Sequence, residues 1–154
     1  MISLREKIKS FLDENIKKKN SIAVSTTRLI LAALKDRDIE SRTKNKSGLI
    51  DDSEIFNMFQ SMIKQRQESV KIYSEAGRDE LKNRELSEIE IIESFLPTQI
   101  KGEELNKIID KICNEIQATN IKDLGRLMTI LKEKYPGQLD LKVAVEYGKS
   151  ILTR

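Results

Sequence analysis

Carboxylates, cations and glycines must carry whatever chemistry this sequence performs, because the usual catalytic side chains are missing. The chain of 154 residues has no histidine and a single cysteine, Cys113. Histidine-dependent nucleophilic sites and histidine-ligated metal sites are therefore excluded, and one cysteine cannot build a four-cysteine zinc site. The sequence also lacks a Walker A motif and a dinucleotide-binding glycine motif. These absences favour a binding protein over an enzyme.

Two groups that resemble catalytic or metal sites have simpler structural explanations. Glu85 and Glu88 lie three residues apart in an acidic stretch, and on a helix such a pair can share a magnesium ion. Solvated carboxylates are much commoner in a sequence this rich in charge, so we expect no metal and no cofactor. Cys113 shares a helical apolar face with Ile109 and Ile112, which predicts a buried structural thiol.

The C-terminal third contains the better candidate for binding. Gly125 is expected near the start of a helix, with Arg126 next to it and Lys122 one turn earlier. Backbone N–H groups at a helix start, together with two cations, are suited to phosphate. Gly137 and Lys142 flank the next turn and would extend this surface. The alternative is that Gly125 serves helix packing and Gly137 a tight turn.

A second candidate surface lies on a long helix in the middle of the chain. It would present cations, a hydroxyl and a phenol along one side, to phosphates or to a partner helix. Its members are Lys64, Arg66, Ser69, Tyr73 and Arg78. The alternative interpretation is an ordinary charged helix that ends at a glycine.

Helical spacing of apolar residues must position these groups, since no segment has a convincing strand pattern. The expected helices cover residues 3–17, 21–42, 51–76, 79–95, 102–116, 120–131 and 140–151, with an exposed loop at residues 44–48. The sequence thus predicts an all-α fold with four longer helices followed by three shorter ones. Pro97 disfavours helix at the residue before it, so we expect a long-helix N-terminal subdomain, 1–96, and a three-helix C-terminal subdomain, 97–154.

The same spacing predicts which apolar side chains face the core. For the first, second, fourth and seventh helices these are Leu4, Ile8, Phe11, Leu12, Ile16, Val24, Leu29, Ile30, Ala33, Leu34, Leu81, Leu86, Ile89, Ile92, Leu96, Val143, Val145, Tyr147 and Ile151. Ser3 and Glu6 are expected to form a capping box at the first helix, and Asp51 and Glu54 at the third.

Charge is unevenly distributed along the chain, although its net value is only +3. Residues 1–50 carry 12 Lys+Arg against 6 Asp+Glu, residues 51–96 carry 6 against 11, and residues 97–154 carry 10 against 8. The basic N-terminal stretch, which includes Arg28, Lys35 and Arg42, would steer a polyanion. We favour the alternative that these cations solubilise the chain and pack against its own acidic helix.

The sequence favours a cytoplasmic location and gives no indication of a membrane partner. Its N-terminus lacks the features of a signal peptide, and no run of about 18 apolar residues occurs. One cysteine also fits a reducing compartment.

Four segments together carry a family resemblance over nearly the whole chain. They are residues 27–35, residues 64–78 continuing through Glu85 and Glu88 to Pro97, residues 123–128, and residues 137–140. Their order and spacing resemble those of the YqeY family (GatB/YqeY-like). That family is similar to the tail domain of the B subunit of Asp-tRNA/Glu-tRNA amidotransferase, and its eukaryotic members are organellar.

The resemblance implies binding rather than catalysis. In the amidotransferase the helical tail engages tRNA, while the amide-transfer chemistry belongs to domains this chain does not resemble. The family carries the label of carbon–nitrogen ligase activity with glutamine as amido-N-donor. We therefore expect a non-catalytic tRNA-binding or tRNA-amidotransferase-associated protein, with tRNA, amidotransferase subunits or another protein as partner. The alternative is a helical protein–protein adaptor that uses the surface from Lys64 to Arg78.

The resemblance assigns RNA binding to the C-terminal residues, with some departures from the family pattern. The expected RNA-binding residues are Lys122, Gly125, Arg126, Gly137 and Lys142. Arg126 stands where the family usually has lysine, which keeps the charge and adds bidentate capacity. Leu141 replaces the usual glycine, and Lys101-Gly102 replaces the usual Ser or Thr helix cap. Because aromatic residues are scarce, we expect recognition of RNA shape and phosphate rather than of bases.

Overall fold

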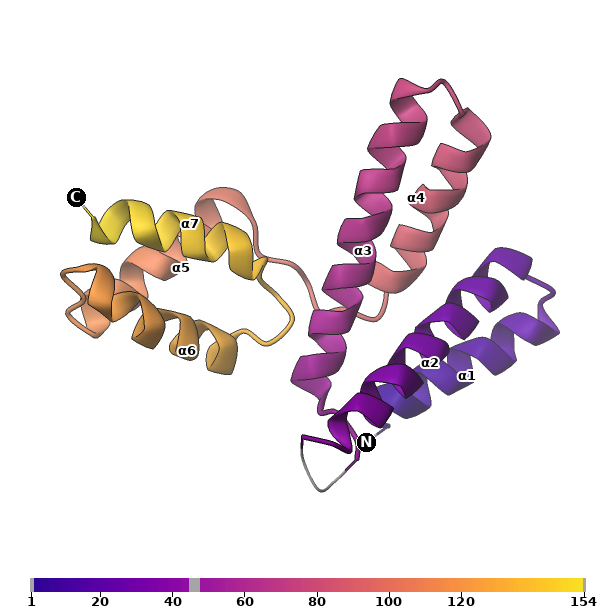
Figure 1. Cartoon of the computed structure of the whole chain (residues 1–154), viewed down its shortest axis with the longest axis horizontal. Coiled ribbons are helices and arrows are strands. Elements are labelled where there is room, and N and C mark those ends of the chain that lie inside the picture. Colours follow the sequence, from indigo (N-terminus) through magenta and orange to yellow (C-terminus); the bar gives the residue numbers. More distant parts are fainter. Residues whose placement is uncertain (1, 45–47, 154) are drawn as a thin grey trace. The chain divides into compact units, whose positions relative to one another are not determined.

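The computed structural model describes residues 2–44 and 48–153, and α-helices make up most of this range (Figure 1). The helices are α1 (Leu4–Lys17), α2 (Ser21–Ser41), α3 (Asp52–Glu75), α4 (Asp79–Glu93), α5 (Gly102–Glu115), α6 (Leu124–Lys134) and α7 (Leu141–Leu152), with a 3-10 turn η1 (Ile121–Asp123) before α6. No strand occurs among the described residues. The predicted all-α fold is confirmed. Residues 45–47 of the expected loop lie outside the described residues.

Two compact units make up the chain, residues 1–96 (unit 1) and residues 97–154 (unit 2). Unit 1 contains two helical hairpins, α1–α2 and α3–α4, which meet near their bases and diverge toward their turns (Figure 1). Its core lies where the hairpins meet and is built mainly from aliphatic side chains and Phe59. Phe95 stacks on Phe59, with ring centroids 5.8 Å apart, and packs edge-on against Phe11 at 5.2 Å.

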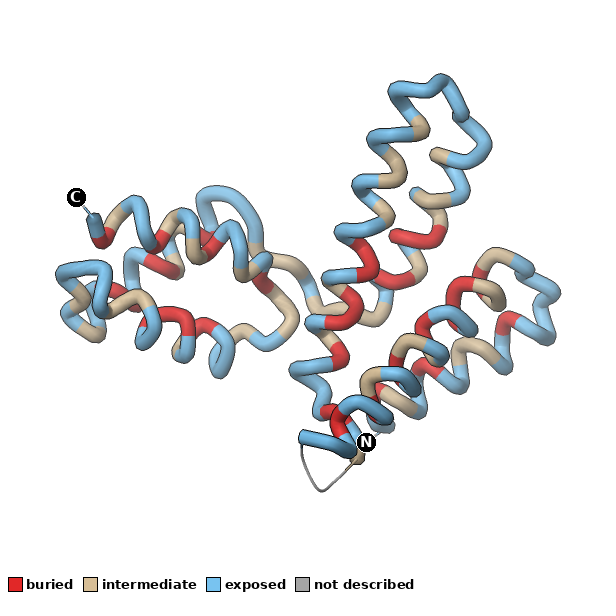
Figure 2. Tube along the Cα trace, viewed as in Figure 1, coloured by how far each residue is buried: buried red, intermediate tan, exposed pale blue. Residues whose placement is uncertain are grey.

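The free end of the α3–α4 hairpin is much less buried than its base. Figure 2 shows the buried positions of α3 and α4 gathered toward the base and exposed ones around the turn. Ile72 is 63% exposed and Leu81 is 39% exposed. This follows from the architecture, because two helices alone cannot enclose a side chain that points away from the hairpin.

The core of the protein is therefore smaller than helical spacing predicts. Five apolar residues expected on inner faces are exposed: Ile16, Leu29, Leu81, Leu86 and Val143. The physical reason is that a helical face is wider than the contact that a neighbouring helix makes with it. Ile30, Leu34, Ile89 and Ile92, by contrast, are buried as predicted.

Helix termini follow local sequence signals closely. Ser3 and Glu6 form the predicted capping box of α1. At the start of α3 only half of the predicted box forms, because the Asp51 carboxylate accepts the Glu54 N–H at 2.9 Å without a return bond from the Asp51 N–H to the Glu54 side chain. After α3, Gly77 has φ +69°, a conformation that glycine adopts without a Cβ penalty. The Arg78 N–H then donates to the Tyr73 carbonyl at 2.9 Å, which closes the turn into α4.

A partly buried ion pair joins α1 to α2 in unit 1. Both Nη atoms of Arg5 on α1 donate to the Asp38 carboxylate on α2 at 2.8 Å. Arg5 also donates to the Ile50 carbonyl, and the Ile50 N–H donates to Asp38 at 2.9 Å. These hydrogen bonds, chiefly those from Arg5, hold the pKa of Asp38 below its ordinary value against the opposing effect of burial. The network thus fixes the entry into α3.

Unit 2 packs α5, α6 and α7 around a separate core. Cys113 is buried in this core, as predicted. Burial raises the pKa of its thiol, and Asp110 and Asp123 raise it further. The approach of α7 to α6 depends on Gly148, where a Cβ atom would lie 3.0 Å from Leu124 and 3.1 Å from Leu127 side-chain carbons.

The segment that leads into unit 2 is tied to the turn before α7. The Ile100 N–H donates to the Gln138 carbonyl at 2.8 Å, and Gln99 Nε2 donates to the Gly137 carbonyl at 2.6 Å.

Among the described helices, none combines the length and the apolar character needed to cross a bilayer.

Candidate nucleic-acid interface

A local hydrogen-bond network sets the direction of the chain at the start of α6. The Asn120 side chain accepts the Lys122 N–H at 2.9 Å. The Asp123 carboxylate accepts the N–H groups of Thr119 at 2.9 Å and of Asn120 at 3.3 Å, and both bonds lower its pKa. Asn120 was expected to cap the sixth helix directly, but it caps the 3-10 turn η1, which leads without a break into α6.

Arg126 has a structural role that the sequence did not reveal. Its Nη2 atom donates to the Ile116 carbonyl at the end of α5 at 2.7 Å and lies 3.5 Å from the Asp123 carboxylate. Its side chain is nevertheless 55% exposed. The guanidinium therefore holds the α5–α6 connection and is still accessible to a ligand. Helical spacing predicts that the Arg126 side chain is exposed. It does not predict the hydrogen bond to the Ile116 carbonyl, which lies ten residues earlier in the chain.

Gly125 lies on an open part of the surface. A Cβ atom built there would have no atom within 4 Å, apart from its chain neighbours and the local helix backbone. The alternative that Gly125 allows close helix packing within the chain is therefore wrong, and Gly148 has that role. Lys122, one turn before Arg126, is exposed as well. The start of α6 thus combines an accessible glycine backbone with two cations.

Gly137 and Lys142 lie at the other end of α6. Gly137 has φ +72° in the turn after the helix, as a tight turn requires. Lys142 is exposed in the first turn of α7, and its N–H donates to Asp140 at 3.0 Å. The 11 residues of α6 place about 16 Å between its two ends. The five residues predicted to bind RNA therefore form two groups rather than one compact site.

The second predicted surface, on α3, is not presented as a continuous row. Arg66 is only 14% exposed, because its Nε donates to Glu88 on α4 at 3.1 Å and its Nη1 to the Met62 carbonyl at 3.3 Å. Ser69 donates to the Gln65 carbonyl at 3.3 Å. Lys64 and Arg78 are exposed and Tyr73 is half-buried. Arg66 thus joins α3 to α4 instead of facing a partner.

Of the acidic pair on α4, Glu88 is engaged in ion pairs within the protein. Glu88 accepts from Arg66 and lies 3.6 Å from Arg84. Burial raises the pKa of Glu85, and the neighbouring Glu88 raises it further. Across the described parts of the chain, no three potential metal ligands of the His, Cys, Asp and Glu types lie together.

These features define a class of small, all-helical, two-unit proteins with an accessible glycine between cations at the start of one helix. The chain matches the Yqey-like protein family over residues 5–152, and it belongs to that family.

Its curated relatives are yeast proteins named "Altered inheritance of mitochondria protein 41, mitochondrial". The Eremothecium gossypii protein is 27% identical over 115 residues, which are 71% of this chain and 61% of that protein. The Candida glabrata protein is 28% identical over 89 residues, covering 58% and 47% of the two chains. The Lachancea thermotolerans protein is 27% identical over 124 residues, covering 72% and 64%. The matches thus span about half to two thirds of these relatives' lengths.

Proposed function

We propose that this protein is a non-catalytic RNA-binding protein. It would contact the phosphate backbone of structured RNA with the residues at the start of α6. The observation that carries the proposal is Gly125, an exposed glycine with no packing partner beside Lys122 and Arg126. Without a side chain at this position, a phosphate group can approach the Gly125 backbone closely. The N–H groups of residues 122–124 already have acceptors within the chain, so the attraction comes from the cations and not from free N–H groups. Two neighbouring cations then supply the electrostatic attraction that dominates affinity for nucleic acids.

The class of RNA comes from the family resemblance, which implies tRNA. The partial burial of the tyrosines supports recognition of RNA through its shape and phosphates. Tyr73, Tyr135 and Tyr147 are all half-buried. The Tyr147 hydroxyl also donates to the Asp110 carboxylate at 2.8 Å. Base stacking needs an exposed aromatic face, so these residues make poor stacking platforms.

We also propose a cellular location and a partner for the protein. It would act in the cytoplasm on tRNA, either alone or together with subunits of a tRNA amidotransferase. The support is the family resemblance and the low cysteine content, since the single cysteine, Cys113, is buried and forms no disulfide, which suits a reducing compartment. Fractionation of cells that express the tagged protein would test this location against the mitochondrial one named for its yeast relatives. Glutaminase and amidation assays with magnesium should show no turnover.

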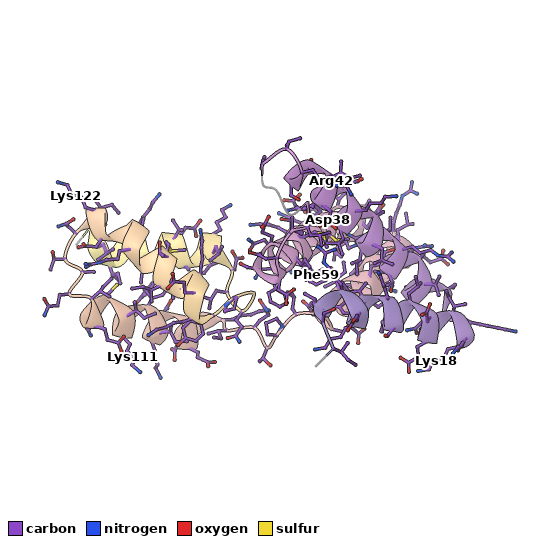
Figure 3. The ribbon with its side chains drawn as sticks, turned by 90° about the horizontal axis from the view of Figure 1, so that it is seen from below. Lys18, Asp38, Arg42, Phe59, Lys111 and Lys122 are labelled. Carbon is purple, nitrogen blue, oxygen red and sulfur yellow. The ribbon has the colours of Figure 1, made fainter. Side chains whose placement is uncertain are left out.

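The direct test is a fluorescence anisotropy titration against bulk tRNA at two salt concentrations, with duplex DNA as competitor. Lys122→Ala should weaken binding at low salt and reduce the slope of log K against log salt by about one. Lys111→Ala is a matched control, since Figure 3 shows Lys111 and Lys122 on opposite sides of unit 2. Lys142→Ala reports whether the interface extends along α6. Absence of saturable binding at micromolar protein, or equal effects of Lys122→Ala and Lys111→Ala, would refute the proposal.

A protein interface is the second candidate function, and unit 1 favours it. Leu29 is 49% exposed, Ile39 is 46% exposed and Leu86 is 44% exposed, all on helices that carry charged neighbours. Apolar side chains of this size add nothing to phosphate binding. The two candidates use different units of the chain, so both can hold.

A further inference from the structure

Helix α2 has apolar residues on its outer face as well as on its inner one. Ile30 is fully buried and Leu34 is 4% exposed, whereas Leu29 and Ile39 on the other side are 49% and 46% exposed. Exposed charged residues surround these two apolar side chains on the outer face: Arg28, Lys35, Asp36 and Glu40. The outer face of α2 is therefore a mixed apolar and charged surface.

A row of cations borders this outer face. Arg28, Lys35 and Arg42 follow one another at seven-residue intervals and are all exposed. Seven residues are close to two helical turns, so Arg28 and Lys35 leave α2 on the same side, about 10.5 Å apart along its axis. Arg42, the C-cap residue of α2, continues this spacing with helical backbone angles. Figure 3 shows Arg42 at the surface of unit 1, beside Asp38.

Helix α4 presents a row of opposite charge with the same interval. Asp79, Leu86 and Glu93 are seven residues apart, and Glu90 lies on the same side, one turn beyond Leu86. All four are exposed, with Leu86 at 44%. Asp79 and Glu93 are 14 residues apart, about 21 Å along α4, and Arg28 and Arg42 have the same separation. The end cations of one row can therefore meet the end carboxylates of the other, while Leu86 occupies the middle position of its row.

We propose that two copies of this chain associate through these faces, with the outer face of α2 in one copy packed on the outer face of α4 in its partner. Within one chain α2 and α4 already meet, but through the inner residues that share the core of unit 1. Their outer faces are left for a second molecule. A two-fold axis repeats the contact, so each copy contributes one basic and one acidic face.

Charge complementarity favours a second copy over a nucleic acid as the occupant. The acidic row of α4 would repel phosphate, and the exposed leucine and isoleucine side chains need an apolar partner. The interface lies in unit 1, whereas the proposed RNA contact lies in unit 2, so the two proposals stand or fall separately.

Sedimentation equilibrium of the full chain tests this proposal. In low salt the weight-average mass should rise with concentration toward twice the 17.7 kDa of one chain. At about 0.5 M salt screening should raise the dimer dissociation constant about tenfold. The double variants Arg28→Glu/Lys35→Glu and Glu90→Lys/Glu93→Lys should each remain monomeric in low salt. An equimolar mixture of the two should dimerise again, because each reversed row then meets its complement.

The controls separate loss of the interface from loss of the fold. Lys7→Glu/Lys9→Glu makes the same charge change on exposed positions of α1 and should dimerise like the wild type. Lysine at positions 90 and 93 suits the C-terminal end of the α4 dipole, so that variant should fold normally by circular dichroism. A monomeric wild type up to a protein concentration of about 200 μM, reversed variants that still dimerise alone, or a mixture that stays monomeric would each overturn the proposal.

Discussion

Asp38 is the buried charge on which the pH dependence of unit 1 should depend. Its pKa is lowered mainly by Arg5, so the pair stabilises the fold above the ordinary carboxylate pKa and is lost as pH falls through the lowered value. Asp38→Asn should lower the free energy of unfolding at pH 7 by about 2–3 kcal/mol, because Arg5 is left without its partner. Urea unfolding between pH 7 and pH 2.5 should show this difference shrinking below about pH 4. A constant difference across that range would contradict the assignment.

At the residue scale the sequence predicted which side chains are exposed near a helix start better than it predicted their contacts. Gly125 and Lys122 could be singled out because a helix start was recognisable, and both are exposed. The contact from Arg126 to the Ile116 carbonyl spans ten residues, and the Arg66–Glu88 pair spans 22. Such partners depend on how helices pack, which helical periodicity does not encode. The role of each residue in binding stays a prediction.

At the element scale Gly148 provides a test of the packing in unit 2. Gly148→Ala would bring a Cβ atom 3.0 Å from Leu124 and should lower the stability of unit 2 by about 1–2 kcal/mol through overpacking. Cys113, the chain's single cysteine, reports this, since its buried, raised-pKa thiol reacts only after local opening.

The readout is the rate at which Cys113 reacts with a thiol reagent under native conditions. We expect that rate to rise about fivefold to thirtyfold in Gly148→Ala. Asp38→Asn is the control: it weakens unit 1, whose core shares no residue with that of unit 2, so the rate should not change. An unchanged rate in Gly148→Ala would mean that helix α7 accommodates the methyl group without strain.

Helix positions were predictable because caps and periodicity act locally. Ser3, Asp51 and Gly77 mark helix boundaries through bonds to neighbouring residues, and the structure confirms all three. Burial was less predictable: Leu81 and Leu86 follow helical spacing yet are exposed, because Leu81 lies in the first turn of α4 at the free end of the α3–α4 hairpin and Leu86 lies on the outer side of α4. Asp38 and Glu88 are buried although charged, because distant arginines pair with them.

At the scale of the whole molecule, function is proposed to divide between the two units. Unit 2 carries the accessible glycine and cations at the start of α6, and unit 1 carries the matched charged faces of α2 and α4. A dimer formed through unit 1 would offer two copies of the RNA contact to one large ligand, which increases avidity without any new contact. The sequence alone indicated the basic N-terminal stretch and the cations near the start of α6. The charged rows on α2 and α4 could be identified only from the exposure of their side chains in the structure.

The central claim is that the backbone at Gly125 contacts RNA, and the substitution Gly125→Ala tests it most directly. Alanine favours helix more than glycine and has open space here, so the free energy of unfolding should stay equal or rise by up to about 1 kcal/mol. Affinity for tRNA, measured by anisotropy on the same samples, should nevertheless fall about tenfold, because the methyl group keeps the phosphate away from the backbone and from the cations beside it. A stable variant that binds tRNA as tightly as the wild type would contradict the account.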